Sequence, residues 1–259
     1  MKFLFIGDIV GRLGRKACRY HLSHNKYDFV IGNVENSAAG FGITDKVYHE
    51  LKDMGFNAMT AGNHTWDKKE ALSLADSWDA FIRPANLSSS LAGKGYRIFN
   101  INNKNICIIN LLGRVFLNMS NCPFEMFDKI YNELPKDTFI LVDFHGEATS
   151  EKVAFGHFAK GRANVICGTH THVQTNDLKM IDKNTLYLTD AGMCGAESSV
   201  IGVEAAPVVE MFSKQVPVRF TVETKGDAMF NGFSFTINDD NIITDYKLIN
   251  EVYPEMELN

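Results

Sequence analysis

Hydrophobic and polar positions follow two patterns along this chain, and each predicts a different kind of element. In the first half, short apolar runs typical of buried strands are followed by stretches whose apolar residues have helical spacing. The run at 3–6 predicts a strand, and the stretch after it predicts a helix that extends to about His24. Thr44 is placed to cap another helix, and Asp67 with Glu70 resembles a capping box that opens a third. This alternation predicts parallel strands joined by helical crossovers.

The middle and the last third of the chain have a different pattern. Two strand-like runs, at 96–101 and 106–112, flank the sequence Asn-Asn-Lys-Asn, which predicts a β-hairpin. Further strands are predicted at 185–189, 216–224 and 230–237. These segments are separated by polar turns rather than by helices, as in antiparallel sheets.

The order of these patterns predicts the architecture. The chain has no low-complexity linker, internal repeat or block of charge, so we expect one domain over residues 1–259. Parallel strand–helix units come first and antiparallel strands come later. The expected fold class is therefore α/β, with two mixed β-sheets between helices in a four-layer α/β/β/α sandwich.

Composition and charge narrow the classes of function. Of the 259 residues, 45% are hydrophobic and 22% are charged, as in an ordinary globular protein. The net charge of −5, with no run of lysine or arginine, argues against a dedicated nucleic-acid surface, although a metal centre could still attract a small nucleotide. Five cysteines without a C-x-x-C pair indicate a reducing compartment. Because no signal-peptide pattern or membrane-length apolar run occurs, we expect a cytoplasmic protein with no membrane partner. Apolar strands in the later half are compatible with a homo-oligomer.

Candidate metal ligands follow five of the apolar, strand-like runs. They are Asp8, Glu35, Asn63, His145, His170 and His172. Because ligands bind outside the carboxyl ends of parallel strands, we expect these side chains to form one site. Carboxylate, imidazole and amide groups suit divalent cations, and a glutamate can bridge two of them. Two metals would clamp a phosphoryl group and activate a water, so the set predicts a two-metal phosphoesterase.

The spacing of the histidines suggests how the roles are divided. His170 and His172 are one residue apart, so in an extended segment their side chains would point to opposite faces and reach different metals. His64 follows Asn63 directly and would point away when Asn63 binds metal. This leaves His64 as a candidate general acid for the leaving alkoxide, or as a phosphate contact.

Other residues near these motifs have two interpretations each. Arg12 and Arg15 could contact an anionic substrate, although a solvated helix face explains them more simply. Glu147 and Lys152 could support the site through hydrogen bonds, but helix capping explains them equally well. No Gly-x-Ser-x-Gly motif occurs, and no cysteine has an evident activating partner, so covalent catalysis has little support.

Longer stretches around the same residues form a series of motifs. They are GDIVGRLGR at 7–15, ENSAAG at 35–40, GNHTWD at 62–67, HG at 145–146, GTHTHVQT at 168–175, TDAGMCG at 189–195 and SVIG at 199–202. The series resembles the motif blocks of the calcineurin-like metallophosphoesterases, and more specifically the bacterial YmdB-like 2′,3′-cyclic-nucleotide 2′-phosphodiesterases. Two departures from the broad superfamily fit the YmdB-like subgroup: Asp8 does not open an Asp-x-His sequence, and the bridging residue is Glu35 rather than aspartate.

The resemblance implies a ligand set and a reaction. One metal would be held by Asp8, Glu35, Asn36 and His172, and the second by Glu35, Asn63, His145 and His170. Iron or manganese is the implied pair, although oxygen and nitrogen ligands do not exclude zinc or magnesium. A metal-bound hydroxide would attack phosphorus in a 2′,3′-cyclic nucleotide, and His64 would protonate the departing 2′-oxygen to leave a 3′-nucleotide.

Two alternatives stay open at the level of sequence. Another phosphoesterase of the same superfamily, a phosphomonoesterase or a nuclease, would share every ligand and act on a different phosphoester. A non-catalytic regulatory module that binds a nucleotide would belong to a different class of protein. Because the seven ligands and His64 are all present, we favour the enzyme.

Overall fold

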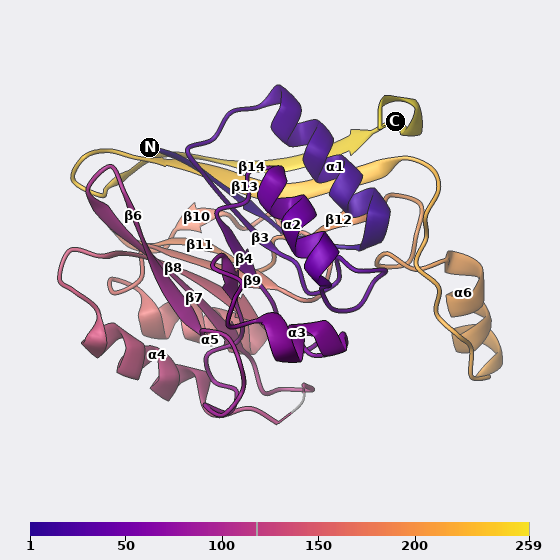
Figure 1. The fold of residues 1–259 in the computed structure, drawn as a ribbon, viewed down its shortest axis with the longest axis horizontal. Helices are drawn as coiled ribbons and strands as arrows, with labels where there is room; N and C mark the ends of the chain where they lie inside the picture. The colour runs from indigo at the N-terminus through magenta and orange to yellow at the C-terminus, as the bar shows by residue number, and fades with distance from the viewer. Residues whose placement is uncertain (118, 259) are drawn as a thin grey trace.

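Two β-sheets packed face to face between helices form the protein in a computed structural model, which describes residues 1–117 and 119–258 (Figure 1). The first sheet has the order β2-β12-β13-β1-β3-β4-β5, with β14 paired to β13. Its strands are β1 (Lys2–Ile6), β2 (Asp8–Ile9), β3 (Phe29–Asn33), β4 (Ala58–Thr60), β5 (Phe81–Ile82), β12 (Met193–Ala196), β13 (Ala228–Ile237) and β14 (Ile243–Tyr253). The second sheet has the order β10-β11-β9-β8-β7-β6. Its strands are β6 (Tyr96–Ile101), β7 (Lys104–Leu112), β8 (Phe139–His145), β9 (Val165–Thr169), β10 (Lys179–Met180) and β11 (Leu186–Leu188).

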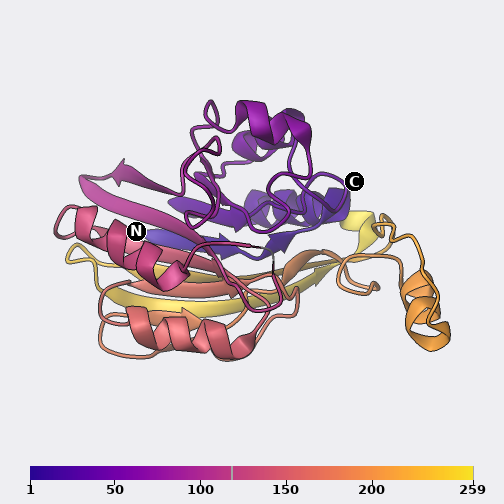
Figure 2. The same ribbon diagram turned by 90° about the horizontal axis from the view of Figure 1, so that it is seen from below.

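Helices cover the outer face of each sheet, which completes the expected four layers. The helices of the described residues are α1 (Gly11–His24), α2 (Asp45–Asp53), α3 (Lys69–Leu74), α4 (Pro123–Glu133), α5 (Thr149–Ala159), α6 (Ala205–Lys214) and the short 3₁₀ helix Glu255–Glu257. Residues of α1, α2 and α3 pack on the first sheet, and residues of α4 and α5 pack on the second. Figure 2 shows that α6 instead projects from the body of the molecule. Within the described part of the chain, no helix is both long and apolar enough to cross a membrane.

The alternation of side chains along each strand explains these layers. In β1, Phe3 and Phe5 face the second sheet, while the residues between them face the α1 side. In β8, Phe139 and Leu141 face the first sheet, while Ile140 and its neighbours pack against α4 and α5. Because both faces of these strands are buried, their sequences are continuous apolar runs.

Parallel pairing brings the ends of several strands to one edge. Strands β1, β3, β4 and β5 pair in parallel in the first sheet, as do β7, β8, β9 and β11 in the second. Hydrogen bonds link the carboxyl ends of the two sheets, since the Asn33 side chain at the end of β3 donates to Asp143 of β8 at 3.2 Å. The carboxyl ends of both parallel sets therefore lie together.

Most of the predicted elements are confirmed, and two predictions are wrong. The hairpin forms as β6 and β7, and Thr44 caps α2 by accepting a hydrogen bond from the Val47 N–H at 3.4 Å. The capping box is absent, because Asp67 binds His64 and α3 begins at Lys69 without a side-chain cap. The segment 216–224 is not a strand of either sheet and makes only one isolated bridge, between Val222 and Val203. This segment runs beside α6, a helix that the apolar pattern did not predict.

The layer between the sheets should dominate stability. Phe3 is fully buried there, with ring centroids 4.7 Å from Phe235 and 5.7 Å from Phe139. We predict that Phe3→Ala lowers the free energy of unfolding by about 3–5 kcal/mol, because it leaves a cavity between two sheets that cannot close on it. Urea denaturation measures this. The matched variant Phe116→Ala, at a side chain that is 88% exposed, should change stability by less than about 0.5 kcal/mol.

Candidate metal centre

The residues expected at the strand ends lie together where the two sheets meet. The first sheet positions its members through β1, β3 and β4, and the second sheet through β8 and β9. Together these strand ends and the loops after them carry Asp8, Glu35, Asn36, Asn63, His145, His170 and His172. Glycine permits this crowding at one point in particular, because a Cβ on Gly62 would lie 2.3–2.4 Å from His145 and Glu35.

One group of atoms surrounds the Nε2 atom of His145. It lies 2.9 Å from Oε1 of Glu35, 2.9 Å from Oδ1 of Asn63 and 3.0 Å from Nδ1 of His170. A ring nitrogen carries at most one hydrogen, so a proton there can satisfy only one of these three neighbours. More acceptor atoms therefore surround His145 Nε2 than the hydrogen on this nitrogen can bind.

Hydrogen bonds around the two histidines fix which nitrogen of each ring faces the centre. The Thr169 hydroxyl donates to Asp143 at 2.7 Å, so it must accept at 2.9 Å from the Nδ1–H of His145. The Glu147 carboxylate lies 3.0 Å from Nε2 of His170 and accepts its hydrogen. These outer hydrogen bonds turn Nε2 of His145 and Nδ1 of His170 toward each other, and whenever His145 is neutral both atoms present lone pairs, as in metal-binding histidines.

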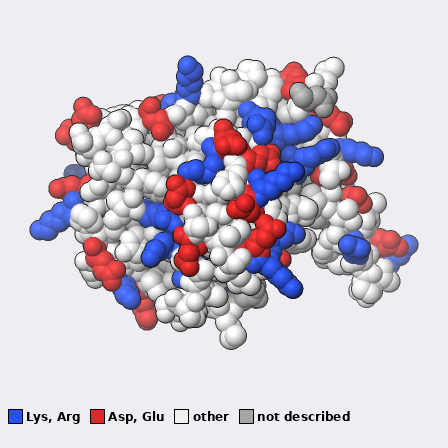
Figure 3. Space-filling view, viewed as in Figure 1, with Lys and Arg blue, Asp and Glu red and all other residues white. Residues whose placement is uncertain are grey.

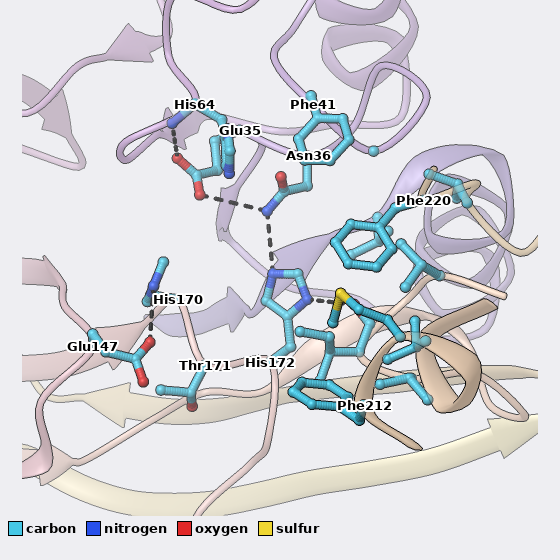
Figure 4. A pocket seen from close by; sticks show the side chains of 18 residues that line it. Glu35, Asn36, Phe41, His64, Glu147, His170, Thr171, His172, Phe212 and Phe220 are labelled. Carbon is cyan, nitrogen blue, oxygen red and sulfur yellow. Dashed lines mark hydrogen bonds and ion pairs between the residues drawn. The ribbon is translucent and has the colours of Figure 1, made fainter. Parts of the chain in front are cut away.

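A second group of atoms forms beside the first. The Ile201 carbonyl accepts from Nδ1–H of His172 at 2.8 Å, which turns the Nε2 lone pair of His172 inward. This Nε2 lies 3.2 Å from the Asn36 amide (Figure 4). It also lies 3.7 Å from Oδ1 of Asp8. The Asn36 amide also lies 3.5 Å from Oε1 of Glu35, and a half-turn of the amide presents its oxygen instead. Glu35 is thus in contact with both groups.

The two groups fit a pair of divalent cations. Their donors are imidazole nitrogens, carboxylate oxygens and amide oxygens, which are the ligands of iron, manganese and zinc. One atom each from Glu35, His145 and His170 lie within 4.8 Å of one another. In the metal-free protein the proton on His145 Nε2 faces Glu35 and the His170 nitrogen, and a cation could take the place of that proton. The arrangement can therefore hold metal, and Glu35 is placed to contact two ions.

The charges inside the site depend on the same contacts. Burial alone would lower the pKa of His145, but the Glu35 carboxylate overcomes it and raises that pKa to about 9. Burial alone would raise the pKa of Glu35, but His145 holds it at about 2. Burial and the neighbouring His145 lower the pKa of His170 to about 3, which keeps that ring neutral as a ligand must be. The site thus keeps one carboxylate ionised in a fully buried position.

The loop that carries His170 and His172 is not the extended segment expected from the sequence. His170 has φ 101° and His172 has φ 65°, in the region that residues other than glycine rarely adopt. The two side chains still reach different groups of ligands, because the loop turns at both residues. Asp190 holds it by accepting hydrogen bonds from the backbone N–H and the hydroxyl of Thr171, at 3.2 and 2.7 Å. Lys152 pairs with the same Asp190 oxygen at 2.5 Å, and both side chains are buried.

His64 lies at the rim of the site. Its backbone N–H donates to Oε2 of Glu35 at 2.9 Å, which ties it to the centre. Its ring is oriented by Oδ2 of Asp67, which accepts from Nδ1–H at 2.8 Å, while Nε2 has no hydrogen-bond partner among the described residues. The ring packs against the edge of Phe41, with centroids 4.9 Å apart. At 31% exposure, the side chain is open to a ligand.

A cavity of about 520 Å³ opens onto the site, a volume suited to a small organic ligand. On one side it is lined by Glu35, Asn36, His64, His170 and His172. The opposite wall is apolar and comes from α6 and from 200–203 and 220–222, including Val208, Met211, Phe212, Phe220 and Val222 (Figure 4). The strand prediction at 216–224 therefore missed a segment that shapes the cavity.

Sequence reasoning also missed the residues that orient the ligands. Asp143 and Thr169 lie inside apolar strands, and Asp190 follows another. A charged residue within the run Phe-Ile-Leu-Val-Asp-Phe was the available signal, since a buried carboxylate requires partners. Lys152 had two interpretations, and the structure supports the one in which it supports the site, because its ammonium group binds Asp190 rather than a helix end.

Comparison with known proteins shows the family to which this chain belongs. A sequence model described as YmdB-like protein matches residues 4–249. The chain belongs to the YmdB-like family. It is 42% identical over 244 residues to a Bacillus subtilis (strain 168) protein named 2′,3′-cyclic-nucleotide 2′-phosphodiesterase, with 92% of each chain covered. It is also similar to the crystal structure of a novel phosphatase from Mycoplasma pneumoniae, at a TM-score of 0.92 and 35% identity, over 100% of this chain and 95% of the other.

More distant solved structures have a similar fold. A 5′-nucleotidase precursor from Thermus thermophilus matches 99% of this chain and 55% of its own, at a TM-score of 0.59 and 13% identity. At that identity the likeness concerns the fold alone. The match supports two mixed sheets flanked by helices as the shared architecture.

The buried pair below the histidine loop offers a test. We predict that Lys152→Met lowers the free energy of unfolding by about 3–5 kcal/mol, because Asp190 is then left as a buried charge without its partner. Chemical denaturation of the metal-free protein measures the change. Lys160→Met, at an exposed lysine just after the same helix, is the control and should be nearly neutral. Equal stability of the two variants would contradict the importance of the pair.

Proposed function

We propose that this chain is a di-metal phosphodiesterase that hydrolyses 2′,3′-cyclic nucleotides to 3′-nucleotides. The observation that carries the proposal is the convergence of inward lone pairs and carboxylates on two adjoining points that share Glu35. The cavity beside them has room for a nucleotide. The 42% identity to a protein named for this activity supports the choice of substrate.

The proposed ligands divide between two metal ions. Asp8, Glu35, Asn36 and His172 would hold one, and Glu35, Asn63, His145 and His170 would hold the other, with iron or manganese as the expected pair. When bound, the two ions would supply the activated water and neutralise the charge that builds on the phosphoryl oxygens. Thr169, Glu147 and the Ile201 carbonyl would keep the three imidazoles in the ligating tautomer.

His64 is the proposed general acid. Hydrolysis to a 3′-nucleotide breaks the bond between phosphorus and the 2′-oxygen, and that oxygen leaves as a poor, basic alkoxide unless it receives a proton. The Nε2–H of His64 can deliver it, because Asp67 holds the other nitrogen and orients the ring. The hydrogen bond from the His64 backbone N–H to Glu35 fixes the position of the residue relative to the proposed metal ligands.

The apolar wall of the cavity suits the rest of a nucleotide. Phe41, Phe212 and Phe220 line it, and aromatic rings stack on any nucleobase. The wall provides no charged group for base recognition, so stacking and shape are its contribution. This predicts a site that accepts more than one base.

The shared carboxylate is tested by Glu35→Gln. We expect the variant to lose bound metal and at least about 100-fold of its activity, because a neutral amide cannot bridge two cations. Elemental analysis measures the metal, and phosphorus NMR follows 2′,3′-cyclic AMP with Mn²⁺ or Fe²⁺. Glu210→Gln on α6 is the control for a lost carboxylate. A Glu35→Gln protein with two metals and full turnover would show that the shared role is wrong.

The general acid is tested by changing the leaving group. We predict that His64→Ala lowers kcat on 2′,3′-cyclic AMP by about 100-fold or more. It should lower kcat on bis(p-nitrophenyl) phosphate far less, because p-nitrophenolate leaves without a proton. Asp67→Asn should have a weaker effect in the same direction. Equal losses on both substrates would argue that His64 binds phosphate instead of transferring a proton.

A further inference from the structure

A second cavity, of about 720 Å³, lies beside the proposed active site and has a different character. Arginines line it at three places: Arg12 and Arg15 from α1, and Arg219 from the segment after α6. Gly11, Ala39, Thr221 and Thr224 complete its wall with the residues shared below, and no aspartate or glutamate is among the described residues that line it. In a chain with a net charge of −5, this is a local concentration of positive charge. Figure 3 shows lysine and arginine side chains gathered where Figure 1 places α1.

The three arginines are not equally available. Arg15 donates to Glu50 at 2.9 Å and to the Ser37 carbonyl at 2.5 Å, so it is occupied by structure. Arg12 and Arg219 are exposed, and neither forms a hydrogen bond or ion pair with the residues that the structure describes. These two guanidinium groups are the ones that can bind a ligand. Each can make paired, charge-assisted hydrogen bonds to a phosphate.

The arginine cavity continues from the active-site cavity. Phe41, Phe220 and Val222 line both. A ligand whose phosphate lies at the metal centre can therefore extend across these apolar side chains to Arg12 and Arg219. Such a ligand has two phosphates, with an apolar, stackable group near the boundary between the cavities.

We propose that Arg12 and Arg219 bind the phosphate on the 5′-oxygen of a ribonucleotide whose 2′,3′-cyclic phosphate lies at the metal centre. This inference rests on the proposed function. A free 2′,3′-cyclic nucleotide carries a 5′-hydroxyl and leaves this subsite unused. The last residue of an RNA chain that ends in a 2′,3′-cyclic phosphate carries a 5′-phosphodiester and fills it. The substrate class is therefore a 5′-phosphorylated ribonucleotide, as at the 3′ end of an RNA fragment.

The size of the arginine cluster limits the number of RNA phosphates that the protein can contact. Two available arginines match one phosphate, and a longer nucleic-acid track would require further positive charge along the chain of phosphates. The absence of a lysine or arginine run in the sequence agrees with this limit. The sequence indicated Arg12 and Arg15 as possible contacts of an anionic substrate, but not Arg219, because most of the chain separates it from them.

The test compares three adenosine substrates with a 2′,3′-cyclic phosphate. The first has a 5′-hydroxyl, the second a 5′-phosphate, and the third is the dinucleotide in which the 5′-oxygen carries a phosphodiester. For the Mn²⁺-loaded protein, kcat/KM should be about tenfold higher for the second and third than for the first. In the double variant Arg12→Ala/Arg219→Ala this ratio should fall toward one. Arg19→Ala, which removes an arginine from α1 outside the cavity, should keep the ratio.

The outcomes separate the inference from the function on which it rests. Hydrolysis of all three substrates at the same kcat/KM would overturn the subsite and leave the phosphodiesterase intact. No hydrolysis of any substrate by protein that contains both metals would overturn the proposed function. A preference for the 5′-phosphate alone would identify 5′-phosphorylated mononucleotides as the source, and an equal or higher rate on the dinucleotide would identify RNA ends. The preference should also shrink as salt increases, but only while both arginines are present.

Discussion

The contact between Glu35 and His145 is the interaction on which the rest of the site depends. It joins the end of β3 in one sheet to the end of β8 in the other, at 2.9 Å and with both side chains fully buried. A carboxylate in such a place is costly unless opposite charge faces it. The protonated imidazole supplies that charge in the metal-free protein, and a cation can replace it. The same contact therefore stabilises the metal-free protein and, in the proposed function, would position Glu35 for metal binding.

The surrounding hydrogen bonds follow from this constraint. A histidine that is to present one nitrogen to a cation needs its other nitrogen held by an acceptor, and each of the three histidines has one. The acceptors come from three different places: a threonine in β9, a glutamate after β8 and a backbone carbonyl near α6. Because these supports are independent, the site is preorganised by the whole fold rather than by one loop. The left-handed backbone at His170 and His172 is tolerable only within such a framework.

The scaffold, and the gathering of the candidate ligands at one edge, could be predicted from the sequence because both leave local signals. Strands buried on two faces leave continuous apolar runs, and polar residues directly after those runs mark the edge where parallel strands end. Long-range contacts leave no such signal. Asp67 had the spacing of a helix cap, but its binding to His64 took precedence. The segment 216–224 had strand composition, but its apolar residues cover a cavity instead of pairing in a sheet. The pairing of Lys152 with Asp190 depends on two loops that only the fold brings together.

The residues proposed for the chemistry and those proposed to select the substrate lie in different parts of the molecule. The ligands lie at the ends of strands whose residues are buried, so changing them disturbs charge balance and packing together. The opposite wall of the cavity comes partly from α6, where Val208 is the buried residue and Phe212 is 75% exposed. Arg12 and Arg219 are likewise at the surface. Substitutions there cost little stability, since they remove few packed contacts. A chain with this fold can therefore change which phosphoester it selects while the metal centre and its supporting hydrogen bonds stay fixed.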